Sequence, residues 1–529
     1  MRILVFHGYL LGGTGSNVYN ARLAEALVRL GHEVHLLCQE RHPQDHAFLS
    51  AAGDWDEGEL RLRQLPSAGT GTAGPGRATM YRPNIARLLP VYVADRYEGV
   101  RAVPFAECTH EQVDAYVRAN VAAVAEVAAL ARPELALANH LVMGPLILAR
   151  GLGQEVPYAV KVHGSALEYT VKPNPGRFLE PAREGIAFAQ GVLVGSHHTA
   201  ASLWGTIADP ALPERTRLGP PGVEVARFAP REPAAAAAGV RALAARLAAE
   251  PARAGGGSQA SAFERDPAEA ALALERLAPE HEPLVAYVGK LIVSKGVDLL
   301  LAAWPLVLER VGAARLVVVG FGAYREGLEE LLAALAAGEL ERARAVALEG
   351  RALEGQGAPA KPLGHLLAFL DGLGGERRER YLAAAAALPE RVVFTGRLEH
   401  EELAELLPAC RALVAPSTFP EAFGMVAAEA AACAAVPIVA RHSGLAEVAG
   451  ALASELPAEA GGWLTFPVDD DAVEAIAERV SATLEAPVEL LARVREGLVA
   501  GVRERWSWER VAEGVIAAAQ GRLDELARP

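Results

Sequence analysis

Residues 3–38, ILVFHGYLLGGTGSNVYNARLAEALVRLGHEVHLLC, contain one complete strand–turn–helix–strand unit. ILVF is a short apolar run typical of a buried strand, and LLGGTGSN supplies the glycine-rich turn that follows it. VYNARLAEALVRLG has the apolar spacing of an amphipathic helix, and HEVHLLC has the pattern of the next strand. Because parallel strands need such a helical crossover, this stretch predicts the first βαβ unit of a parallel sheet.

The same alternation of strand and helix patterns recurs in two series along the chain. ELALAN, YAVKVHG and GVLVGS are each followed by helical sequence, and a second series after Pro230 contains LVAYVG, RLVVVG, RVVFTG, ALVAPS and PIVA. At 529 residues the chain is longer than one hydrophobic core supports. We therefore predict an α/β protein with two doubly wound domains, residues 1–229 and 230–505, followed by a helix within 506–529.

Three segments interrupt this alternation of strands and helices. Residues 66–106 are rich first in glycine and proline and then in aromatic residues and arginine, which predicts an inserted loop. Residues 250–267 have the low complexity of a linker. Residues 336–390 have the pattern of an added helical segment.

The second half of the first insertion, residues 81–105, sets arginines among aromatic side chains. One interpretation is a surface for an acceptor or for anionic lipid. The other, and the more ordinary, is a packed insertion whose arginines are solvated. The arginines in question are Arg82, Arg87, Arg96 and Arg101.

The bulk composition limits the partners and the compartment. The net charge is −14, whereas nucleic-acid binding needs a basic surface, so no nucleic-acid partner is expected. The four cysteines lack CxxC spacing, which predicts neither a disulfide framework nor a zinc site and favours a reducing cytoplasm. We find no signal-peptide pattern and no apolar stretch of about 18 residues, so no transmembrane helix is expected, while peripheral membrane contact stays open.

Two glutamates stand eight positions apart in FPEAFGMVAAEA, residues 419–430. A helix is expected to begin at Phe423 to Met425, so Glu421 precedes its N-terminus and Glu429 lies within it. A helix N-terminus binds phosphate, Gly424 permits close backbone approach, and a carboxylate accepts hydrogen bonds from both hydroxyls of a ribose. The alternative is that Glu421 favours the helix dipole and that Glu429 is a solvated surface acid.

Lysine is rare in this chain, with five residues among 51 basic ones. Two of the five, Lys290 and Lys295, lie together between the strand LVAYVG and the helix that follows it. Paired ammonium groups on a strand-to-helix loop favour a clamp for a diphosphate. Solvated loop lysines are the alternative.

Two further features carry less information. GGTGSN, residues 12–17, can present backbone amides to an anion, although a tight turn explains it equally well and it is not the dinucleotide pattern GxGxxG. His163 ends the strand pattern YAVKVHG, and strand ends in open α/β sheets face the ligand crevice. A lone histidine is more often structural, but at that place it can donate a hydrogen bond.

Four features of the chain, taken in their order, resemble glycosyltransferase family 4, whose members are retaining enzymes of the GT-B fold. They are the glycine-rich loop, His163, G-K-x4-K-G and E-x7-E. The resemblance covers essentially the whole chain, and GPPGVEVARFAP, residues 219–230, is similar to the interdomain segment of the family. It implies two Rossmann-like domains that face a cleft. The first would be the acceptor-side domain, completed by the C-terminal helix within 506–529, and the second would bind the nucleotide-sugar.

The resemblance implies a role for each matching residue. Glu429 would hold the ribose hydroxyls, Lys290 and Lys295 would bind the diphosphate, and Glu421 and His163 would contact the sugar. Catalysis would then rest on Glu421, His163 and Lys295. The expected donor-binding residues are Gly13, Lys290, Lys295, Gly322, Arg397, Leu398, Phe423, Gly424, Met425 and Glu429. The family usually has arginine where Lys290 stands, so a bidentate phosphate contact would become a point charge.

The function implied by the resemblance is retaining transfer of a hexose-type sugar from a nucleotide-diphosphate sugar, UDP- or GDP-linked, to an unidentified small molecule, glycan or lipid. No bound cofactor and no metal are implied, because cationic side chains and a helix N-terminus neutralise the leaving diphosphate. The alternative is a catalytically degenerate GT-B protein that binds a sugar nucleotide or a partner in a regulatory role. A Rossmann oxidoreductase is excluded because GxGxxG follows neither opening strand, and a pyridoxal-phosphate phosphorylase is disfavoured because the later strands of the second domain lack a lysine.

Overall fold

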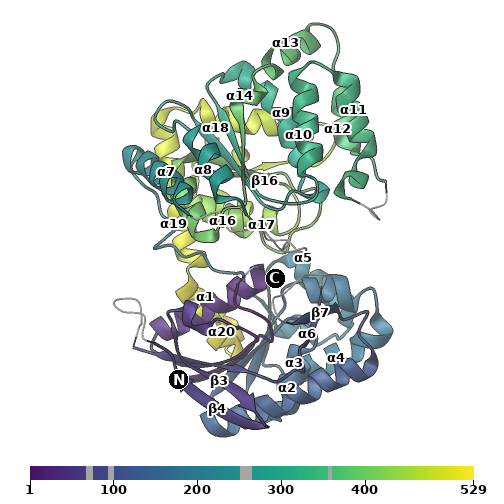
Figure 1. Cartoon of the computed structure of the whole chain (residues 1–529), viewed down its shortest axis with the longest axis vertical. Helices are drawn as coiled ribbons and strands as arrows, with labels where there is room; N and C mark the ends of the chain where they lie inside the picture. The colour runs from purple at the N-terminus through teal and green to yellow at the C-terminus, as the bar shows by residue number, and fades with distance from the viewer. Residues whose placement is uncertain (13, 67–74, 93–99, 251–264, 356–359) are drawn as a thin grey trace. The chain divides into compact units, whose positions relative to one another are not determined.

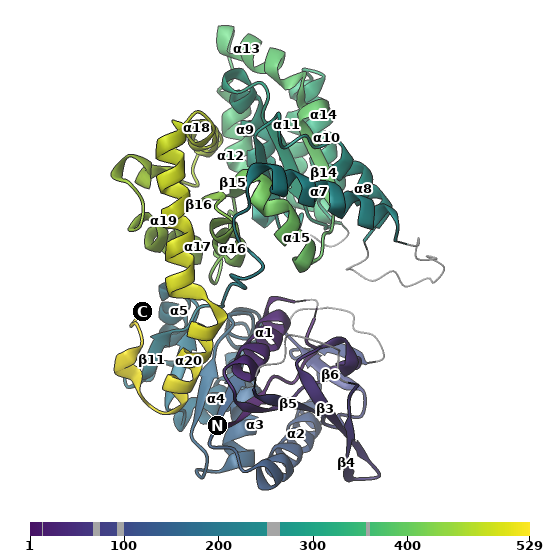
Figure 2. The ribbon, with the colours of Figure 1, turned by 90° about the vertical axis from the view of Figure 1, so that its left-hand side faces the viewer.

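The computed structural model describes residues 1–12, 14–66, 75–92, 100–250, 265–355 and 360–529. The chain forms two compact units, and each is built around its own parallel sheet with helices on both faces (Figures 1 and 2). Unit 1 contains Met1–Gly222 and Trp506–Pro529, and unit 2 contains Val223–Arg505. The predicted α/β fold with two doubly wound sheets is confirmed.

The sheet of unit 1 has nine strands in the order β11-β10-β9-β8-β1-β2-β5-β3-β4. All neighbouring strands are parallel except β3 and β4, which form an antiparallel hairpin. The order reverses between β1 and β8, and such a reversal opens a crevice at the carboxyl ends of the two strands. The strands are β1 (Arg2–Phe6), β2 (Glu33–Leu37), β3 (Leu49–Asp56), β4 (Glu59–Gln64), β5 (Arg77–Arg82), β8 (Leu135–Asn139), β9 (Tyr158–Lys161), β10 (Gly191–Val194) and β11 (Thr216–Leu218).

Two hydrophobic cores cover the two faces of this sheet. Successive side chains of a strand point to opposite faces, so Ile3 and Val5 of β1 enter one core while Leu4 and Phe6 enter the other. The first core is closed by α1 (Gly15–Arg29) and α20 (Trp508–Ala519), and the second by α2 (His110–Ala131), α3 (Gly144–Leu152) and α4 (Pro175–Ala187). The last helix therefore packs in the first unit, as predicted (Figure 2).

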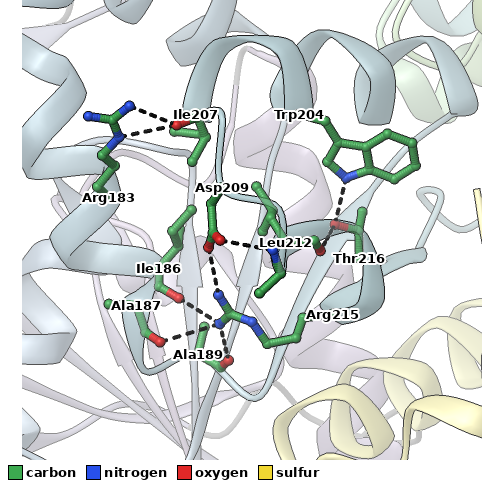
Figure 3. A network of polar contacts seen from close by, with 11 residues as sticks. Arg183, Ile186, Ala187, Ala189, Trp204, Ile207, Asp209, Leu212, Arg215 and Thr216 are labelled. Atoms are coloured by element: carbon green, nitrogen blue, oxygen red, sulfur yellow. Dashed lines mark hydrogen bonds and ion pairs between the residues drawn. The ribbon is translucent and has the colours of Figure 1, made fainter.

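Arginine side chains secure the edge of this sheet near β11 (Figure 3). Arg183 of α4 donates two hydrogen bonds to the carbonyl of Ile207, the last residue of α5 (His197–Ile207). Arg215, which ends α6 (Leu212–Arg215), donates at 3.0 Å to the carbonyl of Ile186 and at 3.0 Å to that of Ala189. The last carbonyls of a helix have no partner within the helix, so these guanidinium groups stabilise the ends of α4 and α5.

The sheet of unit 2 has six parallel strands in the order β14-β13-β12-β15-β16-β17. Its order reverses between β12 and β15, which places a second crevice at their carboxyl ends. The strands are β12 (Leu284–Val288), β13 (Arg315–Val319), β14 (Val392–Gly396), β15 (Cys410–Ala415), β16 (Val436–Ala440) and β17 (Thr465–Phe466). The covering helices include α7 (Pro233–Ala248), α8 (Pro267–Glu275), α9 (Val297–Arg310), α10 (Arg325–Ala336), α15 (His400–Leu406), α16 (Met425–Ala432), α17 (Ser443–Ala453), α18 (Ala472–Leu484) and α19 (Val488–Trp506).

The three predicted interruptions have different outcomes. The prediction of a loop over residues 66–106 is wrong for β5, which pairs with β2 and β3 inside the main sheet. The segment also contributes β6 (Leu88–Val91) and β7 (Arg101–Pro104), which form a small separate sheet. Residues 251–264 lie outside the described part of the chain. The helical character of residues 336–390 is confirmed by α11 (Leu340–Glu349), the short helix η4 (Arg351–Glu354), α12 (Gly364–Asp371), α13 (Gly375–Ala385) and α14 (Leu388–Arg391).

Candidate functional site

The crevice of unit 2 collects the charged residues that the sequence singled out. Lys290 and Lys295 follow β12, and Glu421 follows β15, so they stand on either side of the point where the strand order reverses. Glu429 lies on α16, which begins at Met425 as predicted. Loops after such neighbouring strands diverge and leave room for a ligand at the sheet edge.

Lys295 and Glu421 form an ion pair between their ammonium and carboxylate groups. The hydroxyl of Ser417 donates to the same carboxylate oxygen at 2.7 Å, and the backbone N–H of Glu421 donates to the hydroxyl of Ser443 at 2.9 Å. The side chains of Lys295 and Glu421 are 29% and 25% exposed. The carboxylate of Glu421 is therefore positioned by the lysine loop (residues 290–295) and still reaches solvent.

Gly296 lets the loop after β12 and the loop after β15 approach each other. Its φ is +66°, and a Cβ at this residue would lie 2.0 Å from the carbonyl oxygen of Pro416, so only glycine fits.

Lys290 is exposed, and among the described residues its ammonium group has no hydrogen bond or ion pair. Its carbonyl accepts the hydroxyl of Tyr287 at 2.8 Å, which fixes the backbone at the start of the loop. Lys290 thus presents a positive charge from an anchored backbone.

Glu429 is a buried carboxylate, with 4% of the residue exposed, and the alternative of a solvated surface acid is therefore wrong. Its Oε1 lies 2.6 Å from Nε2 of His400, the first residue of α15. The ring of His400 packs against that of Phe228, with centroids 4.8 Å apart. In the part of the chain that the structure describes, Oε2 of Glu429 receives no hydrogen bond, so it can accept one from a ligand.

The N-terminus of α16 is open to an anionic group. The N-cap residue is Gly424, with a φ of +106°, and no side chain caps the helix. A Cβ at Gly424 would lie 2.6 Å from Cδ2 of Leu445, and one at Gly444 would lie 2.6 Å from Cα of Phe423. Both glycines are required by close packing, and unpaired N–H groups at a helix start favour phosphate or carboxylate.

The loops after β13 and β14 border the same sheet edge. Gly322 has a φ of +154°, and a Cβ there would lie 2.3 Å from the carbonyl oxygen of Leu291, so this glycine supports the lysine loop. The guanidinium of Arg397 lies 5.7 Å from the centroid of the Phe321 ring and forms an ion pair with Glu399 at 3.0 Å. Leu398 is buried. Phe321 and Leu398 thus place apolar side chains next to the charged Arg397 at this sheet edge.

The crevice of unit 1 contains His163 after β9. Its Nε2 lies 2.8 Å from Oδ1 of Asn139, the last residue of β8, so the imidazole donates from Nε2. The ring lies edge-on to that of Tyr19, with centroids 5.0 Å apart. Gly13, the other residue expected from this unit, lies outside the described residues.

Two further histidines, which the sequence analysis missed, lie in this crevice. His7 follows β1, and its Nε2 lies 3.0 Å from Oδ1 of Asn17 while its Nδ1 accepts from Asn20 at 3.0 Å. His140 follows β8, and its ring stacks on that of His7, with centroids 5.8 Å apart, and is tilted against that of His163, with centroids 4.9 Å apart. Both ring nitrogens of His140 are buried, and no described residue hydrogen-bonds them. Such a buried polar group is costly unless a ligand or water satisfies it.

Burial sets the protonation of this cluster. It lowers the pKa of His7 to about 4, and it lowers the pKa values of His140 and His163 well below the usual 6.5. Burial also lowers the pKa of the neighbouring Lys161 to about 7. The three imidazoles are therefore neutral at pH 7 and act there as hydrogen-bond donors and acceptors rather than as cations.

The arginine- and aromatic-rich stretch packs on the body of unit 1. Arg82 forms an ion pair with Asp54 at 2.7 Å, and the rings of Tyr92 and Phe105 stack 5.3 Å apart. Phe105 is buried in the second core, which favours the packed insertion over an exposed surface. Arg96 lies outside the described residues.

Two features are absent from the described residues. In the ranges that the structure describes, no helix is long and apolar enough to cross a membrane. Across the same ranges, no three or more His, Cys, Asp or Glu side chains are grouped so that they could hold a metal ion.

Two sequence families match this chain. Residues 14–213 match the family described as "Glycosyl transferase 4-like domain", and residues 366–497 match "Glycosyl transferases group 1". An uncharacterized glycosyltransferase of Methanocaldococcus jannaschii, MJ1607, is 22% identical over 249 residues. That match covers 47% of this chain and 47% of the relative, so it spans about half the length of each protein.

Solved structures resemble the chain over its whole length. Sucrose-phosphate synthase from Thermosynechococcus elongatus has a TM-score of 0.54 at 18% identity and covers 99% of both chains. HepE from Anabaena, solved in complex with UDP-glucose, has a TM-score of 0.51 at 15% identity and covers 98% of this chain and 99% of its own. A glycosyltransferase from Rickettsia africae has a TM-score of 0.55 at 11% identity and covers 99% of both. At these identities the likeness concerns the fold.

Proposed function

The chain belongs to the group 1, GT4-like glycosyltransferases with the GT-B fold, and we propose that it is a retaining enzyme that transfers a hexose from a nucleotide-diphosphate sugar. The observation that carries this proposal is the ion pair between Lys295 and Glu421 at the reversal point of the second sheet, beside the buried Glu429. The cation is proposed to meet the diphosphate of such a donor, the carboxylate beside it the sugar, and the second carboxylate, on the next helix, the ribose.

The donor is bound mainly by unit 2 in this proposal. Oε2 of Glu429 accepts the ribose hydroxyls while Oε1 stays with His400. Lys290, Lys295 and the uncapped N-terminus of α16 bind the diphosphate, and they stabilise the negative charge that grows on it as the glycosidic bond breaks. Gly322, Arg397 and Leu398 border the base, with Phe423, Gly424 and Met425 as backbone contacts.

Glu421, His163 and Lys295 are the proposed catalytic residues. When the donor enters, its diphosphate competes with Glu421 for the Lys295 ammonium group, and the carboxylate turns to the hydroxyls of the sugar. His163, neutral at pH 7 and with its Nε2–H bound to Asn139, accepts a hydroxyl of the sugar at Nδ1, and Gly13 is the proposed backbone contact to the phosphate. His140 offers two buried ring nitrogens for further hydroxyl groups.

A UDP- or GDP-sugar is the proposed donor. Support for UDP comes from Anabaena HepE, which was solved with UDP-glucose, and from a structure described as trehalose-6-phosphate from E. coli, which was solved with UDP-2-fluoro glucose. The acceptor is a small molecule, glycan or lipid in this proposal. The proposed setting is the cytoplasm, which suits four cysteines that are all free and buried.

A second candidate function is a degenerate protein that binds a sugar nucleotide without transferring sugar. The complete set of charged residues, Glu421, Glu429, Lys290 and Lys295, favours an active enzyme. Slow release of nucleoside diphosphate from the donor in the absence of acceptor separates the two candidates, since only an active enzyme breaks the glycosidic bond.

Thermal unfolding with UDP-, GDP- and ADP-glucose tests the proposal. A donor at a hundred times its Kd stabilises the folded state by about 2.7 kcal/mol, which raises the Tm by a few degrees. We expect one of the three donors to raise the Tm and the matching nucleoside diphosphate to do the same. If none of them shifts the Tm, and Glu429→Ala behaves as the wild type, the proposed donor site is wrong.

A further inference from the structure

We propose that Glu354, on the helical insertion of residues 336–390, positions the lysine loop (residues 290–295) for the donor diphosphate. This inference rests on the proposed function, because it assigns to the insertion a part in the same site. It makes Glu354 a positioning residue, which acts on the diphosphate through the backbone of the loop and does not touch the donor.

The carboxylate of Glu354 binds the middle of the lysine loop. Its Oε1 accepts the backbone N–H of Val293 at 2.7 Å. Val293 is the first residue of the short helix η3 (Val293–Lys295), and the first N–H groups of a helix have no partner within it. A carboxylate at this place satisfies that N–H group with a charge-assisted hydrogen bond and fixes the turn that carries Lys295.

The insertion holds Glu354 in place from its own side. Arg351 Nε donates to Oε2 of Glu354 at 3.1 Å, and the Glu354 side chain is only 16% exposed. The backbone N–H of Arg351 donates to the carbonyl of Lys361 at 3.0 Å. Gly350 has a φ of +53°, and a Cβ there would lie 2.1 Å from the same carbonyl oxygen, so glycine is required at the bridge. Glu354 therefore projects from a fixed turn.

Backbone hydrogen bonds to other described residues hold the lysine loop on either side of Val293. The N–H of Leu291 donates to the carbonyl of Phe321 at 2.8 Å, and the carbonyl of Ser294 accepts the N–H of Thr418 at 2.9 Å. Between these two anchors, Glu354 provides the contact to Val293. Loss of that contact should let the turn before Lys295 move and weaken the hold on a diphosphate, while the distant base and ribose contacts remain.

The test measures binding of a nucleoside diphosphate and of its nucleoside by calorimetry. UDP, GDP and ADP are first compared on the wild-type chain, and the tightest of the three serves as the probe. Glu354→Ala should bind the diphosphate more weakly by up to about tenfold, the limit reached if ordering the loop on binding costs the full energy of that one charge-assisted hydrogen bond. Its affinity for the nucleoside should not change. Glu354→Gln keeps an acceptor oxygen and should recover part of the loss, and Glu341→Ala, an exposed glutamate of the same insertion, should match the wild type.

A second variant removes the other partner of the hydrogen bond. Val293→Pro deletes the N–H group at the first position of η3, where proline is tolerated. The preceding residue, Ile292, is extended, with a φ of −133° and a ψ of 152°, and this is the conformation that a residue before proline prefers. If the two residues act through one hydrogen bond, the double variant should lose no more affinity than the weaker-binding single variant.

Each outcome decides the inference. It is overturned if Glu354→Ala binds the diphosphate as the wild type does, if it loses affinity for the nucleoside equally, or if the two substitutions are additive. If the wild-type chain binds none of the three nucleoside diphosphates, the proposed function itself fails, and this result is distinct from the others.

Discussion

Replacing Glu429 with alanine should remove the recognition of the ribose. The structure sets the size of the effect, because Oε1 already lies 2.6 Å from His400 Nε2 and only Oε2 is left for a hydroxyl group. A hydrogen bond to a charged group contributes roughly 1.5–3 kcal/mol. With one oxygen available we take the lower end, about 1.5 kcal/mol, which is about a tenfold loss of affinity.

Calorimetry with a nucleoside diphosphate and its 2′-deoxy analogue isolates this contact. The wild type should bind the 2′-deoxy compound about tenfold more weakly, whereas Glu429→Ala should bind both compounds with the same reduced affinity. Glu429→Gln keeps an acceptor for His400, so it separates loss of the ribose contact from displacement of α15. Glu341→Ala serves as a control for the loss of a glutamate charge. If folded Glu429→Ala still discriminates against the 2′-deoxy compound as the wild type does, Glu429 does not bind the ribose.

Four further predictions concern the two crevices. Lys295→Ala should weaken diphosphate binding by about tenfold or more without changing nucleoside binding, whereas Lys361→Ala should change neither; equal losses for both ligands would mean that Lys295 serves the fold. Gly322→Ala forces a Cβ against the carbonyl of the lysine loop and should lower the free energy of unfolding by about 1–3 kcal/mol in denaturant titrations, and a neutral result would contradict the packing argument. His140→Phe should lower sugar transfer by about tenfold at unchanged nucleoside diphosphate affinity, and transfer at the wild-type rate would remove His140 from the site. Burial lowers the pKa of Lys161 to about 7, so between pH 7 and about 10 this lysine is protonated in the unfolded chain and neutral in the folded one. The free energy of unfolding of the wild type, compared with that of Lys161→Met, should therefore rise from pH 7 to 9. A difference that does not change with pH would show that the pKa of Lys161 is not lowered.

The fold could be predicted from the sequence because its signals are local. Short apolar runs of β-branched residues alternate with amphipathic stretches, and these runs became β1, β2, β8 to β10 and β12 to β16. β5 escaped prediction because it begins and ends with arginine and follows a run of glycine and proline. Its strand character comes from pairing between β2 and β3, which local sequence does not specify.

The residues of the candidate site also divide into those with a local sequence signal and those without one. Glu421, Glu429 and the lysine pair stand in compact motifs next to a strand end or a helix start, so their proximity follows from the βα connection. His7 and His140 were missed because they meet only through the strand order β9-β8-β1, although each stands at the end of a predicted strand, as His163 does. Glu354 gave no signal, since its contact with Val293 depends on how the insertion folds.

Proton NMR of an α-linked nucleotide-glucose incubated with the protein tests the central claim most directly. It follows in one tube the loss of the donor's anomeric proton and the configuration of the new one, with water or an added sugar as acceptor. We expect release of nucleoside diphosphate, a product signal that is first α, and loss of both in Lys295→Ala. A product that is first β would contradict retention, and an unchanged donor with UDP-, GDP- and ADP-glucose alike would contradict the assignment of this chain as an active nucleotide-sugar glycosyltransferase.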